Sequence, residues 1–222
     1  MWLMNDDSVR GDMTSRYDAV RARMNTGELY VDTGEGLEAL EAARTHGQEL
    51  LYDFNHTRPG QTEERERLLR ELLGAVGDPV WIEPPFLAAY GSHVYIGEAF
   101  YANFNLVIVD DADVHIGDRV LFGPNVTITT AGHPIEPSLR VGGAQYSVPV
   151  HIEDDVWIGG SAVVMPGVTI GAGSVVGAGS VVTNHIPSRV VAVGTPCRVV
   201  RPIGPEDQEF RFRHPGQARR QS

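Results

Sequence analysis

The hydrophobic positions of the chain follow a period of six residues over much of its length. From Ile152 to Val182 an aliphatic residue recurs at every sixth position without a gap. A period of six is not helical, but it is a multiple of the strand period of two. It predicts a β-helix with one short strand per six residues, each pointing an apolar side chain inward. Two shorter series precede this one and are separated by a slip of two residues: Ile96, Ala102 and Ile108, then Ile116, Phe122 and Ile128.

The spacing of these positions also decides the fold class. A β-sandwich of short strands is the alternative, but sandwich strands are not spaced so evenly. We therefore predict a mainly β protein, with a parallel β-helix over residues 81–200.

The hexad pattern is interrupted over 129–149, which reads TTAGHPIEPSLRVGGAQYSVP. Unstructured loops longer than about 12–15 residues are uncommon inside a compact domain and are usually functional. We expect this segment to be extruded from the β-helix. His133 lies near its base, and Pro134 restricts the backbone there.

The segments before and after the hexads have other patterns. Residues 1–14 show no periodicity and are expected to form a disordered leader, and 201–222 form a C-terminal tail. Residues 15–80 predict a small helical region, in which the clearest helix runs from Thr62 to about Val76. Thr62 suits an N-cap, and the end of this helix is marked by Gly74, Gly77 and Pro79.

Composition narrows the functional classes. The 222-residue chain has a formal net charge of −11, which disfavours binding to nucleic acid or to an anionic membrane. No apolar run reaches the length of a membrane span. The single cysteine, Cys197, excludes an intrachain disulfide. These features favour a cytoplasmic protein.

Several motifs give the hexads a family context. The chain resembles the hexapeptide-repeat sugar O-acetyltransferases of the galactoside, maltose and nodulation-factor types. This resemblance implies a left-handed parallel β-helix, acetyl-CoA as co-substrate, no metal, and a homotrimer with active sites between subunits. The segments that carry it are LYDFNH (51–56), YANFNLVIVDD (101–111), GHP (132–134), YSVPV (146–150), VWIGG (156–160), PGVTIGAGSVVGAGSVVT (166–183) and GTPCRVVR (194–201).

The resemblance assigns the catalytic role to His133. Transfer of an acetyl group to a sugar requires the attacking hydroxyl to lose its proton. An imidazole, with a reference pKa of about 6.5, can accept that proton near neutral pH. The expected reaction is therefore direct transfer with His133 as general base.

The resemblance also assigns binding residues, one by one. The acceptor-site residues are Asp32, Tyr101, Asn103 and Asp111; Asn103 is placed at the thioester as well, and Tyr101 has a simple packing role as its alternative. Trp157 matches an aromatic residue of the binding groove, with core packing as its alternative. The other acetyl-CoA residues are Gly160, Ala178, Thr183, Asn184, Arg198 and Arg201, the two arginines near the phosphates.

Three positions depart from the family pattern. Ala89 stands where the galactoside enzyme has serine, Gln145 where several relatives have glutamate, and Asn184 where lysine is common. These departures leave the reaction class unchanged and put the identity of the acceptor in question.

Two alternatives remain open at this point. One is a non-catalytic trimeric β-helix scaffold. The other is a metal-dependent enzyme of the γ-carbonic anhydrase type, because His115, His133 and His151 stand 18 positions apart. We expect the two-residue slip and the long loop to break the register between these histidines, and His115 and His151 to point outward.

Overall fold

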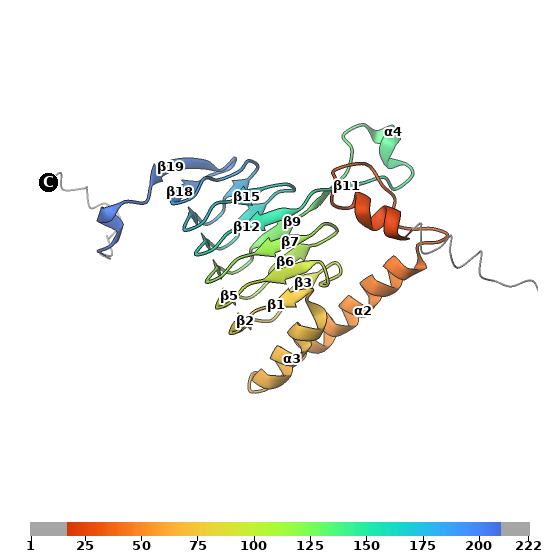
Figure 1. The fold of residues 1–222 in the computed structure, drawn as a ribbon, viewed down its shortest axis with the longest axis horizontal. Coiled ribbons are helices and arrows are strands. Elements are labelled where there is room, and N and C mark those ends of the chain that lie inside the picture. The colour runs from red at the N-terminus through yellow and green to blue at the C-terminus, as the bar shows by residue number, and fades with distance from the viewer. Residues whose placement is uncertain (1–16, 210–222) are drawn as a thin grey trace, which may run out of the picture.

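A computed structural model describes residues 17–209 of the chain. The leader predicted over 1–14 and the last part of the predicted tail lie outside these residues. Helical residues 17–23 are followed by two longer helices, α2 (Glu38–Asn55) and α3 (Thr62–Leu72), and then by a β-solenoid. Figure 1 shows α2 and α3 at one end of the solenoid and the last strand, β19 (Arg198–Pro202), at the other.

The solenoid has three faces, each made by one sheet. All strand pairs in them are parallel except the last one, β18 with β19. The first sheet contains β1 (Ala75–Val76), β4 (Val94–Ile96), β7 (Val114–Ile116), β12 (Val150–Ile152) and β15 (Thr169–Ile170). The second contains β2 (Val80–Ile82), β5 (Phe100–Ala102), β8 (Leu121–Phe122), β13 (Trp157–Ile158), β16 (Val175–Val176), β18 (Val190–Val193) and β19. The third contains β3 (Phe86–Ala88), β6 (Leu106–Val109), β9 (Thr127–Thr129), β14 (Val163–Val164) and β17 (Val181–Val182).

The hexad positions fill the interior, as the sequence predicts. Each coil runs from the first sheet to the second and then to the third, and one hexad residue per strand points inward. All of these hexad residues from Ile96 to Val182 are at most 4% exposed. Burial of one such aliphatic side chain contributes roughly 1.5–3 kcal/mol, so the hexad residues of the three faces make a large contribution to the solenoid's stability.

The solenoid starts earlier than the sequence indicated. The helix predicted from Thr62 to about Val76 ends at Leu72, and Ala75–Val76 instead form β1, paired with β4. Gly74 explains the change, because its backbone N–H donates to the Val94 carbonyl oxygen at 3.0 Å. A Cβ atom at position 74 would lie only 2.5 Å from the Ser92 carbonyl oxygen, so only glycine lets the chain enter the first coil here.

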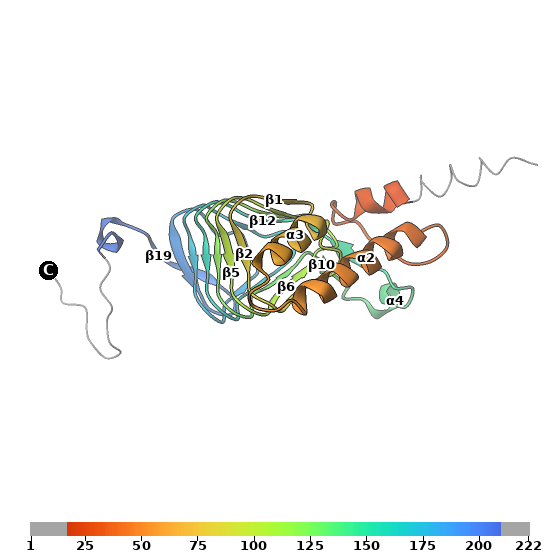
Figure 2. The same ribbon diagram turned by 90° about the horizontal axis from the view of Figure 1, so that it is seen from below.

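The two helices close the open end of the solenoid (Figures 1 and 2). Phe54 of α2 is fully buried and meets Phe86 of β3 edge to face, with ring centroids 6.5 Å apart. The apolar stripe of α3 joins the same core as the hexad residues. No helix among residues 17–209 is both long enough and apolar enough to cross a membrane.

The interruption over 129–149 is a hairpin. Its two short strands, β10 (Ala131–Gly132) and β11 (Tyr146–Ser147), are antiparallel, with Ala131 opposite Ser147. The short helix α4 (Pro137–Arg140) lies at its tip, which projects from the solenoid (Figure 1). The hairpin leaves and re-enters the solenoid between β9 and β12, where the third sheet leads into the first.

Candidate active site

The hairpin is fixed by the N-terminal region. Tyr30 and Gln145 exchange two backbone hydrogen bonds, with N···O distances of 2.9 and 3.0 Å. The hydroxyl groups of Tyr30 and Ser147 lie 2.9 Å apart, and both residues are buried. The segment after the first helix therefore acts as a third strand beside the hairpin, and it holds the residues at the base of the hairpin in place.

This arrangement sets the tautomer of His133. Its Nδ1 atom lies 3.0 Å from the carbonyl oxygen of Ala144, across the hairpin. A carbonyl oxygen can only accept a hydrogen bond, so Nδ1 carries the proton and donates it. Nε2 then keeps its lone pair, on a side chain that is exposed. An imidazole in this state can accept a proton from a bound hydroxyl group.

A network of polar side chains lies close to the base of the hairpin. Arg44 of α2 pairs with Asp32 and donates to the hydroxyl of Tyr90 at 2.7 Å. Gln145 Nε2 donates to Asp111 Oδ1 at 3.3 Å. The side chain of Asp32 is 13% exposed and Asp111 is buried. Two predicted acceptor residues are therefore brought together, each with a partner from its own chain.

The electrostatics of this network are those of a desolvated site. Burial raises the pKa of Asp111, and the negative charge of nearby Asp32 adds to this effect, while Arg44 opposes it. Burial also raises the pKa of Tyr90 to about 12. Arg44 and Tyr90 were not identified from the sequence. The sequence gives little indication of Arg44, because an arginine on a helix rich in charged residues resembles an ordinary surface residue.

Thr183 and Asn184 lie at the same edge of the solenoid as the hairpin, because they follow β17 of the third sheet. Both are exposed, and Asn184 Nδ2 donates to Thr183 Oγ1 at 3.1 Å. We call this edge, where the third sheet leads into the first, the hairpin corner. It holds Asp111, His133, Thr183 and Asn184, with Asp32 packed against it.

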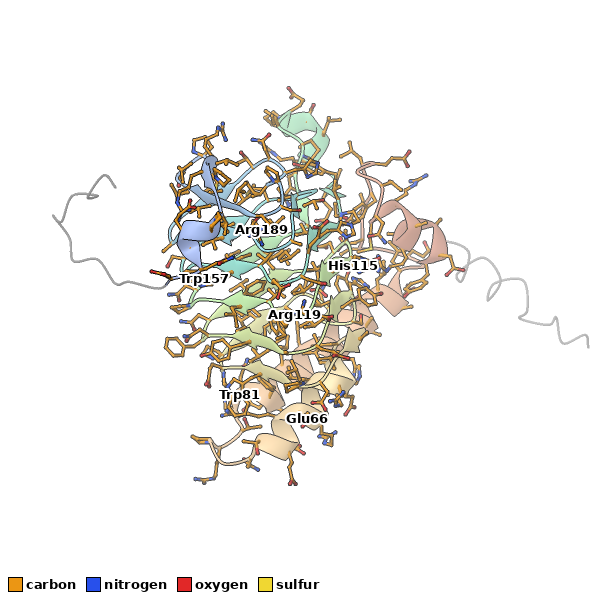
Figure 3. The ribbon with its side chains drawn as sticks, turned by 60° about the vertical axis from the view of Figure 1, so that its left-hand side comes forward. Glu66, Trp81, His115, Arg119, Trp157 and Arg189 are labelled. Carbon is orange, nitrogen blue, oxygen red and sulfur yellow. The ribbon has the colours of Figure 1, made fainter. Side chains whose placement is uncertain are left out.

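The other predicted residues lie elsewhere. Tyr101, Trp157 and Arg201 all belong to the second sheet, and their side chains lie in one outward row of its register: Trp81, Tyr101, Leu121, Trp157, Val175, Val191 and Arg201. We call this surface the seven-stranded face. Trp157 is 53% exposed, so core packing does not explain it. Figure 3 shows Trp81 and Trp157 on one side of the solenoid and His115 on another.

Asn103, Gly160 and Ala178 lie at the edge between the second and third sheets. Asn103 Oδ1 accepts the backbone N–H of the next residue, Phe104, at 2.8 Å. The coils stack closely at this edge: a Cβ atom on Gly159 would lie 2.5 Å from the backbone nitrogen of Ala178. Coil stacking therefore requires glycine at position 159.

The two arginines expected at the acetyl-CoA phosphates differ in their surroundings. Arg198 is exposed, and its Nη1 donates to its neighbour's carbonyl oxygen, that of Cys197, at 2.7 Å. Arg201 instead forms a two-bond ion pair with Asp207, at 2.7 and 2.8 Å. From the sequence alone, both arginines are assigned the same role at the phosphates.

The histidine spacing proves more regular than the sequence indicated. His115 and His151 are in direct register on β7 and β12, and their rings stack with centroids 4.9 Å apart. The expectation of a broken register was wrong, because the hairpin returns the chain to the edge it left. Both side chains point outward as predicted, and His133 is not in their column. Within residues 17–209, no group of three or more His, Cys, Asp or Glu side chains is arranged to hold a metal ion.

A capped three-sided solenoid of hexapeptide coils with a histidine-bearing hairpin defines a hexapeptide-repeat transferase, and comparison with known proteins agrees. Residues 149–184 match the family model for the bacterial transferase hexapeptide (six repeats), and 23–77 match the maltose acetyltransferase hexapeptide capping motif. The chain is 50% identical over 191 residues to galactoside O-acetyltransferase of Escherichia coli K12, covering 86% of this chain and 93% of that protein.

Solved structures give the same result. A galactoside acetyltransferase in complex with coenzyme A superposes with a TM-score of 0.84 at 49% identity, covering 87% of this chain and 96% of that one. A maltose O-acetyltransferase from Clostridium difficile 630 gives a TM-score of 0.80 at 42% identity, covering 83% and 97%. The chain belongs to the hexapeptide-repeat sugar O-acetyltransferase family, and it is an enzyme of that family.

Proposed function

We propose that this enzyme transfers the acetyl group of acetyl-CoA to a hydroxyl group of a galactoside or a related glycoside. The observation that carries the proposal is the hydrogen bond from His133 Nδ1 to Ala144, which leaves Nε2 as an exposed proton acceptor. The similarity to galactoside and maltose O-acetyltransferases, one of them in complex with coenzyme A, supports the choice of donor and acceptor.

The proposed reaction is a direct transfer. Nε2 of His133 takes the proton of the acceptor hydroxyl as its oxygen attacks the thioester carbonyl carbon. The tetrahedral intermediate then collapses, the C–S bond breaks, and the imidazolium returns its proton to the departing sulfur. The products are the acetyl ester of the sugar and free CoA. Asn103 is proposed to meet the thioester end of the donor.

The acceptor would bind beside the hairpin corner. Asp32 and Asp111 are the two carboxylates of the network described there, and carboxylates accept hydrogen bonds from sugar hydroxyls. Ala89 lies at the same corner. It has no hydroxyl group, so the acceptor would make one polar contact fewer than with the serine that the galactoside enzyme has at this position. Tyr101 is the predicted acceptor residue least suited to this position within one chain, because it belongs to the seven-stranded face.

This separation supports a homotrimer. One chain places its candidate base at the hairpin corner and several of its predicted donor residues on the seven-stranded face or at the next edge. If the face of one subunit packs against the hairpin corner of its neighbour, both sets line one site. The exposed apolar row on the seven-stranded face, including Trp81, Leu121 and Trp157, is suited to such a contact. Acetyl-CoA would then lie along the coils, with Gly160 and Ala178 beside its pantetheine arm and Arg198 near its phosphates.

A non-catalytic scaffold is less well supported. A scaffold has no need of a hairpin histidine held in one tautomer, nor of the carboxylates Asp32 and Asp111 held near the base of the hairpin. The expected partners are thus a small hydroxylated acceptor and other copies of the chain, with neither nucleic acid nor membrane. The buried, unpaired Cys197 fits the reducing cytoplasm, which is the proposed compartment.

The test is release of CoA thiol from acetyl-CoA in the presence of galactosides, glucosides, maltose and amino sugars. Galactoside-dependent release well above the rate of donor hydrolysis is expected. If none of the sugars on the panel raises CoA release above the rate of donor hydrolysis, the proposed activity is contradicted. If only amino sugars raise it, the acceptor class changes.

A further inference from the structure

The ion pair between Arg201 and Asp207 closes the C-terminal turn. Arg201 lies in β19, and Asp207 ends the short 3-10 helix η1 (Pro205–Asp207). Nη1 of Arg201 donates to Asp207 Oδ2 at 2.7 Å, and Nη2 donates to Asp207 Oδ1 at 2.8 Å. The two side chains are 34% and 29% exposed, so the pair remains accessible to a ligand.

The geometry of this pair leaves one edge of the guanidinium group open. A guanidinium has five N–H donors and two edges that can bind an oxyanion with two hydrogen bonds. Asp207 occupies the edge formed by Nη1 and Nη2, and Nη1 also donates to the Pro202 carbonyl oxygen at 3.0 Å. None of residues 17–209 accepts a hydrogen bond from Nε of Arg201. Within the part of the chain that the structure describes, the edge formed by Nε and Nη2 is therefore open.

Asp207 is itself held by the turn. Its Oδ2 accepts the backbone N–H of Gly204 at 3.0 Å, which ties the carboxylate to the start of η1. The turn is joined to the solenoid through Ile203, whose N–H donates to the Arg189 carbonyl oxygen at 2.8 Å. Asp207 therefore fixes the plane of the guanidinium relative to the solenoid.

Arg201 also has a fixed place on the surface. It continues the outward row of Trp157 on the seven-stranded face, three strands further along: β13, β16, β18 and β19. At about 4.8 Å per strand, the two positions are about 14 Å apart. That distance suits an extended donor with its thioester arm near Trp157 and its nucleotide end near Arg201.

We propose that Asp207 is a positioning residue for acetyl-CoA: it orients Arg201 so that the Nε and Nη2 edge meets a phosphate of the nucleotide. This inference rests on the proposed function. Asp207 contacts no part of the donor. It acts through Arg201 by removing the rotational freedom that a long side chain would otherwise lose on binding.

The main test replaces Asp207 by asparagine, which keeps the shape of the side chain but cannot accept two bonds from a guanidinium. Asp207→Asn should raise the KM for acetyl-CoA about three- to tenfold and leave kcat nearly unchanged. Acetylated pantetheine carries no nucleotide phosphates, so the effect should vanish with that donor. In an Arg201→Ala background, Asp207→Asn should add nothing, because the residue acts through the arginine.

The direction of the effect separates positioning from simple charge. Loss of a negative charge near a polyanionic donor should lower KM by itself. Glu206→Gln, in the same turn, is the matched control, because it removes the same charge and leaves the ion pair intact. We expect this control to leave KM unchanged or slightly lower, and Asp207→Glu to retain most of the wild-type affinity. A KM that falls or stays constant in Asp207→Asn would overturn the proposal.

A second measurement distinguishes this inference from the function on which it rests. The affinity for CoA can be measured by calorimetry without any acceptor. If wild type and Asp207→Asn bind CoA equally well, the positioning role is wrong and the proposed function stands. If wild type neither binds CoA nor turns over acetyl-CoA, the proposed function fails and this inference fails with it. Equal melting temperatures of the two proteins would show that the C-terminal turn does not support the fold, and a tenfold KM effect would then belong to the donor contact.

Discussion

The hairpin corner and the seven-stranded face differ in how far one chain completes them. At the hairpin corner nearly every polar group already has a partner: Asp32 with Arg44, Asp111 with Gln145, and His133 with Ala144. On the seven-stranded face, Trp81, Leu121 and Trp157 are 40%, 46% and 53% exposed. Large apolar side chains in an exposed row commonly mark a contact surface.

The comparison shows that the polar groups of the hairpin corner are already paired within one chain, whereas the seven-stranded face exposes its apolar side chains. The candidate base and the carboxylates are oriented by hydrogen bonds within the chain, so their geometry does not depend on assembly. Trp157 and Arg201, two of the residues that we assign to the donor, lie instead on the seven-stranded face. The four predictions below test this division, from the largest expected effect to the smallest.

The first prediction removes the candidate base. His133→Ala should lower kcat by about 10²–10⁴, because general-base catalysis contributes an effect of that size. The KM for acetyl-CoA should hardly change, because a general base contributes to the chemical step rather than to binding of the donor. His46→Ala is the matched control, because His46 is an exposed histidine of α2 and should have full activity. Wild-type turnover by His133→Ala would exclude the mechanism.

The second prediction concerns assembly. One variant carries His133→Ala, and the other carries Trp157→Ala with Arg198→Ala. When they are co-expressed, sites that combine an intact hairpin corner with an intact face should form between different subunits. A random mixture in a cyclic trimer gives such sites at about a quarter of positions. At an acetyl-CoA concentration well below the wild-type KM, where both parents are weakly active, about a quarter of wild-type activity should therefore return. Purified mixed oligomers with no more activity than either parent, or a fully active monomer in sedimentation, would show that one chain holds the whole site.

The third prediction concerns Arg198. Arg198 is exposed, and among residues 17–209 its guanidinium has one hydrogen bond, to the carbonyl oxygen of Cys197. A charge-assisted bond to phosphate is worth about 1.5 kcal/mol or more, so Arg198→Ala should raise the KM for acetyl-CoA about tenfold. Acetylated pantetheine is the control donor. If the defect is equally large with that donor, Arg198 supports the fold rather than the phosphates.

The fourth prediction concerns His151 in β12 of the first sheet, which belongs neither to the hairpin corner nor to the seven-stranded face. Burial, and then the neighbouring His115, lower the pKa of His151. The unfolded chain therefore binds more protons at this position as the pH falls through about 6.5, and acidification costs stability. Between pH 7.5 and 5.5 the melting temperature of wild type should therefore fall by about 1–2 °C more than that of His151→Thr. The pH profile of kcat should not change. If the difference in melting temperature between the two proteins does not depend on pH, His151 is not the source of the acid-dependent loss of stability.

The hexads allowed most of the fold to be predicted. Positions such as Ile158 and Val176 are inward because each coil is stabilised locally by the residue above and below it, and a regular pattern is then sufficient. The family motifs led to His133, Asp32 and Asp111, and the pattern alone does not explain why Asp32 and Asp111 lie close together in the structure. Their roles stay predictions until they are tested.

Other features depend on contacts between distant segments. The pairing of Tyr30 with Gln145 joins residues that are 115 positions apart, through strands too short to have a sequence signature. The pair of Arg201 and Asp207 crosses a turn whose path was not apparent from composition. The stacking of His115 on His151 depended on where the hairpin rejoins the solenoid, which spacing alone did not reveal.

The hairpin's return to its own edge has an evolutionary consequence. Val114 and Val150 pair directly, although the whole hairpin lies between them. Because neither the coil below nor the coil above shifts, the hairpin can be lengthened, shortened or exchanged without any compensating change in the hexads. Selection can therefore revise this one segment while the coils on either side are inherited unaltered, which is a modular route by which a single solenoid can carry hairpins of different length and sequence.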